Sequence, residues 1–282
     1  MAQEKVAVVT GSSSGIGLLT SIELAKHGYR VVATMRDLGR SAALQQAAQN
    51  AAVAERVELR RLDITQHDSL AGVVEAIVRD HGRIDVLVNN AGFSTAGFAE
   101  DTLLAEIRDQ METNFFGNVA MTKAVLPVMR RQRSGHIIFV TSIAGRIGQP
   151  MLSAYSASKF ALEGWSEALR IEMYSLGIRV ALVAPGSYET DIWTRNVKVS
   201  AGALDPNSPN KERSQRFAEF VKNDVKKRDP HEVAELIVRI ARDPEPRLHY
   251  VIGRDATMQK WFRALAPWRK YERIIAKAVK ID

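Results

Sequence analysis

The N-terminal stretch of the chain constrains its fold more than any other. Residues 5–10 (KVAVVT) predict a buried strand, GSSSGIG follows directly, and Leu18, Leu19 and Ile22 then begin an amphipathic helix. A glycine turn between a strand and a helix is the context in which a helix N-terminus binds phosphate groups. A generic glycine turn is the alternative, and the two flanking elements favour phosphate binding over it.

The glycines of this turn have separate expected tasks. Gly11 permits the turn, Gly15 lets backbone N–H groups approach a pyrophosphate, and Gly17 permits close packing of the helix. The other residues of the turn are expected to contact the cofactor that carries this pyrophosphate. They are Ser12, Ser13, Ser14 and Ile16.

Strands and helices continue to alternate along the chain. Further strands are expected at 30–35, 57–65, 84–88, 136–142, 178–186 and 248–253, with helices at 41–54 and 68–81 and two helices between 101 and 133. This alternation predicts an α/β fold with a doubly wound, parallel, seven-stranded sheet that binds its ligands at the carboxyl ends of the strands. The polar motifs considered below all lie at such ends.

The composition indicates one globular domain with a C-terminal tail. Of the 282 residues 46% are hydrophobic and 25% are charged, and neither a signal peptide nor a long apolar run is evident, so we expect a cytoplasmic protein. The chain has no cysteine and its six histidines lack ligand spacing, so we expect no metal.

The positive charge is concentrated at the C-terminus. Residues 257–282 contain seven Lys or Arg and two Asp or Glu, a balance of +5 within a total of +7. The remainder of the chain is close to neutral, so nucleic-acid binding is not expected.

The candidate chemistry lies between Ser142 and Lys159. Tyr155 and Lys159 are four residues apart on a predicted helix, and Ser142 follows a predicted strand. An ammonium group ~5 Å from a phenolate stabilises it by roughly 3 kcal/mol at an effective dielectric constant of ~20, which predicts a Tyr155 pKa about two units below ~10. Taken alone, a Tyr and a Lys one turn apart are usually just solvated.

Residues at the end of the second strand bear on the cofactor. An acidic residue there suits the adenosine ribose of NAD, whereas a basic residue suits the 2′-phosphate of NADP. Met35 is neutral and Arg36 is cationic, with Ser12 and Ser13 as additional donors, so the sequence favours NADP (NADPH). The adjacent Asp37 opposes that preference, and a merely solvated Arg36 is the alternative.

Seven motifs occur in one order: TGSSSGIG, LDIT, NNAG, Asn114, Ser142, YSASK and APGSYET. In these motifs the chain resembles the short-chain dehydrogenase/reductase family, and the resemblance extends through the seventh strand to about residue 253. It implies a Rossmann fold, and it implies that Tyr155 is the acid/base and Lys159 lowers its pKa and holds the nicotinamide ribose. Ser142 would bind the substrate oxygen, and Asn114 would position water in a proton relay.

The resemblance also implies the remaining cofactor contacts. Asp63, with Ile64, would face the adenine. The loop from Asn89 to Gly92, with Asn89, Ala91 and Gly92 as contacts, would face the adenosine side. Pro185, Gly186, Tyr188 and Thr190 would face the nicotinamide carboxamide and pyrophosphate. Family members commonly dimerise through the helices that hold Asn114 and Tyr155, which implies a homodimer or homotetramer.

The segments outside these motifs concern the substrate. The ATMRD sequence and the long insertion 191–228 look most like the hydroxysteroid and retinol dehydrogenase branch. The insertion contains a Pro/Asn/Ser-rich stretch and an amphipathic stretch at the place expected for a substrate lid, with a mobile surface loop as the alternative.

The C-terminal extension, 257–282, predicts a basic amphipathic helix. On a helical projection Trp268, Tyr271, Ile274, Ile275, Ala278 and Val279 share one arc, and the opposite arc is cationic. Such a helix at 268–280 can bind an anionic membrane peripherally, or it can pack on its own domain or on a partner subunit. The packed arrangement is favoured.

Together these observations predict a catalytic domain over 1–256 that acts as an NADP(H)-dependent oxidoreductase on an alcohol or carbonyl of an apolar steroid-, retinoid- or ketone-like molecule. A ketoacyl-carrier-protein reductase is an alternative, against which the C-terminal extension argues. A cofactor-sensing module without turnover is a second alternative, disfavoured by the complete set of candidate catalytic residues.

Overall fold

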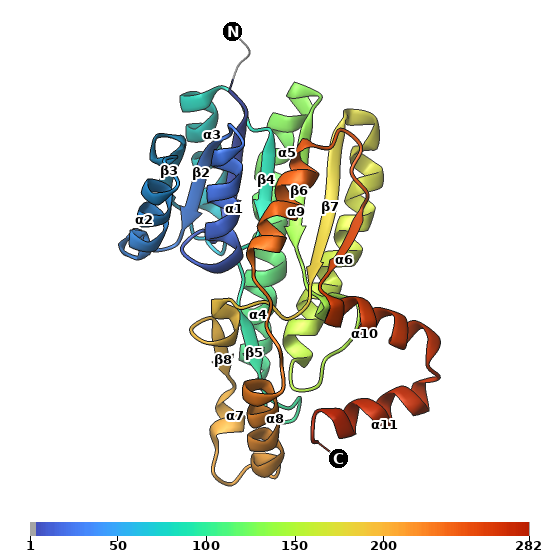
Figure 1. Ribbon diagram of the computed structural model, residues 1–282. Coiled ribbons are helices and arrows are strands. Elements are labelled where there is room, and N and C mark those ends of the chain that lie inside the picture. The colour runs from blue at the N-terminus through green and yellow to red at the C-terminus, as the bar shows by residue number, and fades with distance from the viewer. Residues whose placement is uncertain (1–3, 282) are drawn as a thin grey trace.

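A seven-stranded parallel sheet forms the upper half of the molecule as drawn in Figure 1, which confirms the predicted fold class. The structure is a computed structural model that describes residues 4–281. The strands are β1 (Val6–Thr10), β2 (Arg30–Met35), β3 (Val57–Arg61), β4 (Val86–Asn89), β6 (Gly135–Val140), β7 (Ile178–Pro185) and β9 (His249–Ile252). Their order is β3-β2-β1-β4-β6-β7-β9. The direction of winding changes between β1 and β4, where such folds bind ligands.

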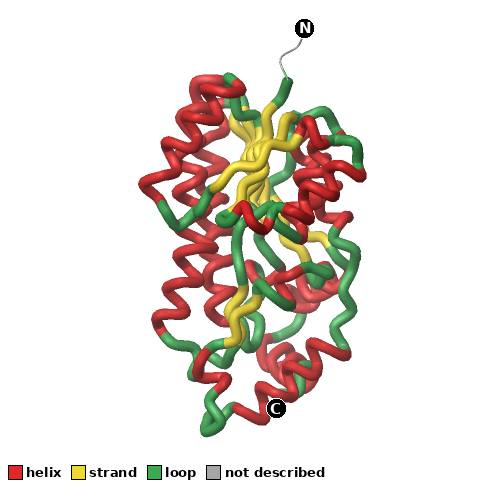
Figure 2. The backbone as a smooth tube through the Cα atoms, turned by 90° about the vertical axis from the view of Figure 1, so that its left-hand side faces the viewer, coloured by secondary structure: helices red, strands yellow, loops and turns green. Residues whose placement is uncertain are grey.

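Helices cover both faces of this sheet, as the side view of Figure 2 shows. One face carries α1 (Gly15–Lys26), α2 (Ala42–Asn50) and α9 (His231–Arg242), and the other carries α3 (His67–His81), α5 (Asn118–Gln132) and α6 (Ser153–Met173). Because both faces are covered, β1 and β4 are buried along their whole length. This explains why β1 and β4 are largely continuous apolar runs rather than alternating ones.

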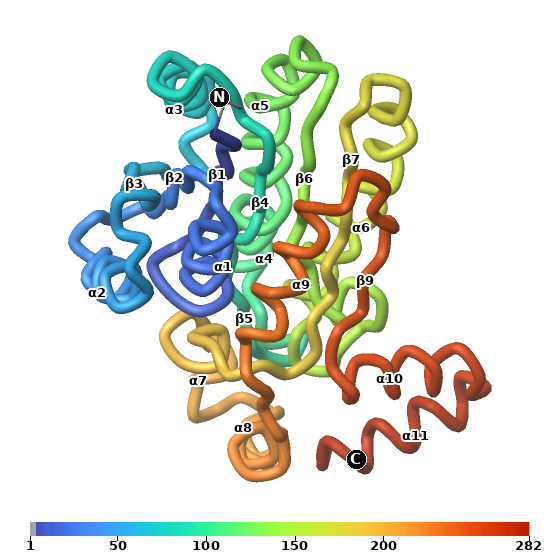
Figure 3. The backbone as a smooth tube through the Cα atoms, turned by 45° about the horizontal axis from the view of Figure 1, so that its top comes forward, coloured from blue at the N-terminus to red at the C-terminus, as the bar shows by residue number. Residues whose placement is uncertain are grey.

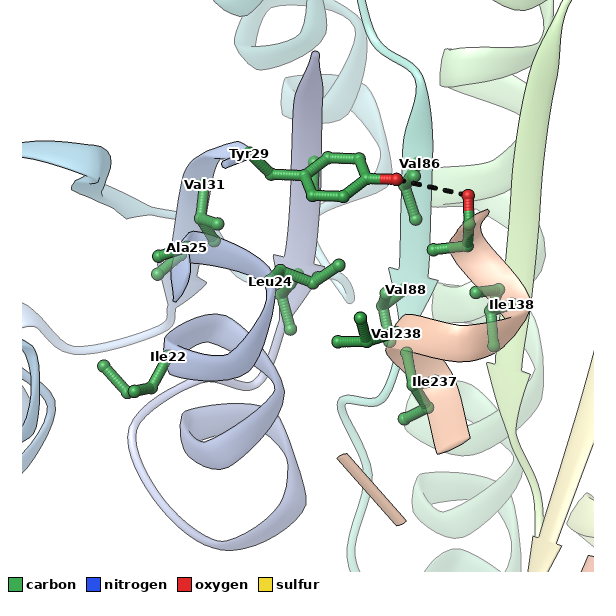
Figure 4. Close-up of a cluster of buried hydrophobic side chains, with 14 of the residues drawn as sticks. Ile22, Leu24, Ala25, Tyr29, Val31, Val86, Val88, Ile138, Ile237 and Val238 are labelled. Atoms are coloured by element: carbon green, nitrogen blue, oxygen red, sulfur yellow. Dashed lines mark hydrogen bonds between the residues drawn. The ribbon is translucent and has the colours of Figure 1, made fainter. Parts of the chain in front are cut away.

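The core between the sheet, α1 and α9 is shown in Figure 4. Leu24 of α1 packs there with Val88 and Ile237, and all three are fully buried. The hydroxyl of Tyr29 donates a hydrogen bond to the Ala241 carbonyl at 3.2 Å, so the one polar atom of this ring has a partner. Elements more than 200 residues apart in sequence are joined here.

Three predicted boundaries differ from the structure. The helix predicted at 41–54 ends at Asn50, because Ala52 adopts a positive φ of 53°. Strand β3 ends at Arg61, before the LDIT motif. The two helices expected between 101 and 133 are α4 (Leu104–Met111) and α5, and a π-helical turn η3 (Glu112–Gly117) joins them without a break.

The lower half of Figure 1 contains the segments that the sequence assigned least well. The short strands β5 (Ser94–Ala96) and β8 (Val197–Val199) form a second, parallel two-stranded sheet, and α10 (Arg254–Leu265) follows β9; none of the three was predicted. The insertion 191–228 also contains η6 (Asp191–Trp193), α7 (Ala201–Leu204) and α8 (Lys211–Asn223). Within residues 4–281, no helix combines the length and apolar character needed to cross a membrane.

The C-terminal helix α11 (Trp268–Ala278) packs partly on its own domain. Tyr271 is buried against Ile143 and Ile147 of the loop after β6, and Ile275 contacts the same cluster. The apolar arc is only half covered, because Trp268 and Ile274 remain 57% and 49% exposed. Figure 3 shows α10 and α11 as a helical hairpin at the edge of the molecule.

The insertion and the C-terminal extension meet at the end of the chain. On α8, the Nε atoms of Arg213 and Arg216 each donate to a backbone carbonyl, of Ile281 and Lys280 respectively, at 3.1 Å. Lys280 also pairs with Asp224 just beyond α8 at 2.9 Å. Helix α8 is therefore attached to the end of α11 rather than being free in solvent.

Candidate active site

A cleft of about 540 Å³ opens at the carboxyl ends of the central strands. Most of the residues singled out from the sequence line it: Gly11, Ser13, Ser14, Gly15, Ile16, Arg36, Asp63, Ile64, Ala91, Gly92, Ser142, Tyr155, Lys159, Pro185, Gly186, Tyr188 and Thr190. The topology brings these side chains together because parallel strands end at the same edge of the sheet.

The glycine turn has the geometry that a close ligand requires. Gly11 and Gly15 adopt positive φ values of 69° and 55°. A Cβ on Gly17 would lie 2.3 Å from the Gly11 carbonyl oxygen, so the turn packs directly on the helix. Ser14, the N-cap residue of α1, makes no side-chain cap hydrogen bond, and the first turn contains no acidic residue. The N–H groups of this helix end therefore suit an anion.

Besides Gly17, which packs the turn against the helix, two residues assigned to the cofactor do not line the cleft. The Ser12 hydroxyl is fully buried and donates to the Val9 carbonyl at 2.9 Å, so the expectation that it helps to bind a 2′-phosphate is wrong. Asn89 is buried and donates to Thr122 Oγ1 at 2.9 Å, beneath the cleft floor. Side chains on consecutive residues of a strand point to opposite faces, and it is the next residue, Asn90, that lines the cleft.

Asn90 supports the glycine turn from the neighbouring strand. Its Nδ2 donates to the carbonyls of Thr10 and Gly11 at 2.9 and 3.1 Å. The Thr10 hydroxyl in turn accepts from the backbone N–H groups of Asn90 and Ala91, both at 3.0 Å. The ends of β1 and β4 are thus held together directly under the turn.

Ser142, Tyr155 and Lys159 meet where β6 ends and α6 begins. Ser142 precedes the short helix η4 (Ile143–Gly145), and its hydroxyl is hydrogen-bonded to the Tyr155 phenol. Lys159 Nζ donates to the Val140 carbonyl at 2.8 Å and lies 5.7 Å from the centroid of the Tyr155 ring. The predicted convergence of a strand end and a helix face therefore occurs in the structure.

Burial controls the protonation of this group. Desolvation raises the pKa of Tyr155 to about 12, although the hydrogen bond from Ser142 acts to lower it. Desolvation also lowers the pKa of Lys159 to about 8, and the charge of Glu163 opposes that change. The expectation of a Tyr155 pKa about two units below its ordinary value is not met in this structure, because desolvation by burial outweighs the lowering by the Ser142 hydrogen bond. Tyr155 is consequently a protonated phenol at neutral pH.

Asn114 lies behind the cleft within the π-helical turn η3 and is fully buried. Its Oδ1 accepts from the Phe93 N–H at 3.1 Å, and its Nδ2 donates to the Phe93 carbonyl at 2.9 Å. A Cβ on Gly92 would lie 2.9 Å from the same Oδ1. The asparagine that disfavours a regular helix therefore fixes the backbone of the cleft wall, and π-turns are frequent at such places.

Two arginines and two aspartates line the end of the cleft beside β2. Arg36 is exposed there, and Arg40 of η1 (Leu38–Arg40) lines the same wall. Asp37, which the sequence set against Arg36, accepts a hydrogen bond from the Gly39 N–H at 2.9 Å and caps η1. Asp63 accepts from the N–H and hydroxyl of Thr65 at 3.0 and 2.7 Å.

Several cleft residues were not identified from the sequence. Besides Arg40, they include Phe93, Trp193 and Lys198. The Trp193 indole N–H donates to the Tyr188 carbonyl at 2.8 Å, and Lys198 Nζ lies 4.3 Å from the centroid of the Phe93 ring. Trp193 and Lys198 belong to the insertion, where no repeated pattern marks which residues face inward. Arg40 alone had a usable signal, as a second cation four residues after Arg36.

Comparison with known proteins agrees with this site. A family model described as short chain dehydrogenase matches residues 5–200. The chain is 40% identical to the oxidoreductase YusZ of Bacillus subtilis over 97% of this chain and 98% of that one. It is 42% identical to human retinol dehydrogenase 8 over 67% of this chain and 61% of that protein.

Solved structures extend the likeness to three dimensions. A short-chain dehydrogenase from Streptomyces avermitilis superimposes with a TM-score of 0.80 at 31% identity, covering 96% of this chain and 98% of that one. A metagenomic short-chain oxidoreductase in complex with NADP gives 0.68 at 27% identity, covering 89% and 96%. Fold, cleft and relatives agree, and the chain belongs to the short-chain dehydrogenase/reductase family of nicotinamide-dependent oxidoreductases.

Proposed function

We propose that the protein is an NADPH-dependent reductase of ketones or aldehydes carried by apolar small molecules, and that it catalyses the reverse oxidation of the alcohols. The observation that carries this proposal is the phenol of Tyr155, hydrogen-bonded to Ser142 and next to Lys159 in one wall of a cleft whose opposite end holds Arg36 and Arg40. Acid, oxyanion partner and cofactor groove are thus in one continuous space.

The chain's own residues supply the proton half of the reaction. Tyr155 is protonated at neutral pH, so it can donate its proton to a carbonyl oxygen as charge develops there. The Ser142 hydroxyl stabilises the same oxygen by a hydrogen bond. Lys159, whose Nζ donates a hydrogen bond to the Val140 carbonyl, carries a positive charge beside the phenol. This charge stabilises the phenolate that remains after Tyr155 has given up its proton. In the oxidation direction each proton transfer is reversed.

The cleft residues fit a nicotinamide dinucleotide with a 2′-phosphate. The uncapped N-terminus of α1 suits the pyrophosphate, and Arg36 and Arg40 suit the additional phosphate. When bound, the nicotinamide supplies or accepts the hydride. The NADP found in a structural neighbour supports the same assignment.

The substrate end of the cleft supports an apolar ligand. Phe93, Ile192, Trp193 and Tyr188 all line it. Aromatic and aliphatic side chains in a cleft wall favour molecules that bury a hydrocarbon surface. The likeness to a retinol dehydrogenase supports the same substrate class.

Replacement of Tyr155 by Phe tests the reaction type. Loss of the proton donor should lower turnover roughly 10²–10⁴-fold, while NADPH affinity should stay within about twofold of wild type. Turnover is followed by NADPH absorbance with retinoid, steroid and aliphatic carbonyls, and cofactor affinity by fluorescence titration. A Tyr155→Phe enzyme with wild-type turnover would refute the assignment, and NADPH binding without turnover of any carbonyl would favour a sensing module.

The cofactor preference is tested at Arg36 and Arg40. The double variant Arg36→Gln, Arg40→Gln should weaken NADPH binding by roughly 10–100-fold and leave NADH binding nearly unchanged, since a charge-assisted hydrogen bond contributes about 1.5–3 kcal/mol. Arg30, whose side chain pairs with Glu4 outside the cleft, provides the matched control as Arg30→Gln. Equal losses for both cofactors, or a wild-type preference for NADH, would contradict the proposal.

A further inference from the structure

A buried group of charges lies directly behind the catalytic lysine. Glu163 is one helical turn after Lys159 on α6, and the two residues are 6% and 5% exposed. A Cβ on Gly145 would touch both, at 3.1 Å from Lys159 Cβ and 3.2 Å from Glu163 Cγ. The two side chains therefore leave the same face of α6 and lie side by side under the η4 loop.

The carboxylate of Glu163 is held in place from two other elements. Its Oε1 accepts from the Thr141 hydroxyl at 2.6 Å, and its Oε2 accepts from Arg146 at 2.9 Å. Thr141 directly follows β6, and its hydroxyl oxygen also lies 3.0 Å from the Val183 carbonyl. The carboxylate is thus fixed between the sheet and the loop that carries Ser142, without any contact to the cleft.

The network continues outward to the surface. Arg146 also contacts His249 Nδ1, and His249 Nε2 lies 3.2 Å from the carboxylate of Glu167. Burial and the charge of Arg146 lower the pKa of His249, so His249 is neutral at physiological pH. The charges that face Glu163 are therefore Lys159 from its own helix, Arg146 from the loop, and Glu167 one turn farther along α6.

We propose that Glu163 is a positioning residue that acts through Lys159: its carboxylate, fixed by Thr141 and Arg146, is the counter-ion that keeps the buried lysine charged beside Tyr155. The buried Lys159 and the partly exposed Arg146 lie on either side of one anion, and without it the lysine would lie uncompensated in the protein interior. The functional consequence rests on the reductase activity proposed above, whereas the electrostatic role of Glu163 does not.

The first test measures the lysine directly. Wild type, Glu163→Gln and Glu163→Asp are pulse-labelled with acetic anhydride across pH, and acetylation of Lys159, which lines the cleft, is quantified by peptide mass spectrometry. Only the neutral amine reacts, so the midpoint reports protonation. The midpoint is expected near pH 8 in wild type. It should fall by about one unit or more in Glu163→Gln and stay near the wild-type value in Glu163→Asp.

The second test measures the consequence for turnover. The alkaline limb of the kcat profile should move to lower pH in Glu163→Gln together with the labelling midpoint. Glu172→Gln, an exposed carboxylate on the same helix, should leave both unchanged. Glu163→Met, an apolar replacement of similar volume, is the second variant if the Gln variant does not fold.

An unchanged labelling midpoint in a folded Glu163 variant would overturn the proposal, as would a uniform loss of activity at all pH values with an unmoved alkaline limb. A shifted midpoint in a protein that reduces no carbonyl would instead refute the proposed function and leave the role of Glu163 supported.

An independent observation concerns the outer surface of α10. Met258, Trp261 and Leu265, spaced at i, i+3 and i+7, are 69%, 58% and 79% exposed, and Trp268 after the helix break is 57% exposed. The stripe lies on the hairpin at the edge of the molecule (Figures 1 and 3). It is distinct from the face of α11 that packs on the domain, where Tyr271 is buried against Ile143 and Ile147.

Cations surround this stripe. Lys260, Arg269 and Lys270 are exposed beside it, and none of them has a carboxylate partner among residues 4–281. Arg263 stacks its guanidinium 4.5 Å from the Trp268 ring centroid. We infer that the α10 stripe binds the surface of an anionic membrane: tryptophans and aliphatic side chains suit the interfacial region, and unpaired cations suit acidic headgroups. A second copy of the chain would bring the same cations against each other.

Vesicle co-sedimentation tests this surface with the full chain. Binding to phosphatidylcholine vesicles that contain phosphatidylserine should exceed binding to vesicles of phosphatidylcholine alone. The double variant Trp261→Ser, Leu265→Ser should reduce this binding by roughly tenfold or more, and high salt should do the same. Leu204→Ser, an equally exposed apolar residue on α7, is the matched control. Equal partitioning of wild type and variant would overturn the inference. A variant that changes the oligomeric mass without any vesicle binding would assign the stripe to self-association instead.

Discussion

At the scale of single residues, desolvation decides the chemistry of the site. Burial acts on Tyr155 and Lys159 in the same sense, since it disfavours the charged form of each. The result is a phenol that keeps its proton and an ammonium that loses its proton near pH 8 rather than near 10.5. Burial of Lys159 beside Tyr155 therefore lowers the stability of the folded protein as long as the lysine is charged.

This cost predicts how stability depends on pH. The pKa of Lys159 is about 8 in the folded state and near 10.5 in the unfolded state. Between these pH values the unfolded chain binds more protons than the folded chain. The free energy of unfolding therefore rises as pH rises through this range. Relative to Lys159→Met, wild type should gain up to about 3 kcal/mol between pH 7.5 and 10.5. Urea unfolding of both proteins at the two pH values measures the difference, and a pH-independent difference would contradict the argument.

At the scale of elements, the π-helical turn η3 is the least regular and most informative piece of the fold. It widens the helix between α4 and α5 by a residue, and this places Asn114 against the backbone of Phe93 instead of in a regular helical position. The residue acts on the cleft through the wall that it holds.

Asn114→Ala should therefore destabilise the protein and disturb the cleft together. Loss of both hydrogen bonds to Phe93 should lower the free energy of unfolding by about 2 kcal/mol, because the Phe93 N–H loses its partner and the Phe93 carbonyl keeps only the Gln110 amide at 2.9 Å. Thr113→Ser, in the same turn, is the control and should change it little. The measurement is urea denaturation combined with NADPH titration, and wild-type stability of Asn114→Ala would show that water replaces the side chain without cost.

At the scale of the whole molecule, α6 presents an uncovered apolar stripe opposite to its catalytic face. Ala157, Phe160, Gly164, Ala168 and Ile171 follow one side of the helix and are exposed, with Phe160 at 45% and Ile171 at 79%. No atom lies within 4 Å of a Cβ built on Gly164. Small residues between large apolar ones let another helix approach closely, which supports the homodimer expected from the resemblance.

Light scattering should consequently give a mass of at least twice 31.3 kDa for wild type. The double variant Phe160→Glu, Ile171→Glu should shift the protein toward monomers, because it places like charges across a two-fold interface. Leu204→Glu, exposed elsewhere, should leave the mass unchanged. A monomeric wild type, or a mass that the double variant does not alter, would contradict the proposal.

The sequence by itself determined the doubly wound sheet, the glycine turn and the convergence of Ser142, Tyr155 and Lys159. Hydrophobic periodicity and the alternation of strands and helices can be recognised locally along the chain, and parallel strands end at the same edge of a sheet. Only the tertiary structure decided that Asn89 is buried while Asn90 faces the cleft, that Ser12 is buried, and that desolvation raises the pKa of Tyr155. The direction in which a side chain points and its degree of hydration depend on residues far away in the chain. The same holds for Glu163 and the α10 stripe, whose surroundings are assembled from β6, η4 and the C-terminal hairpin.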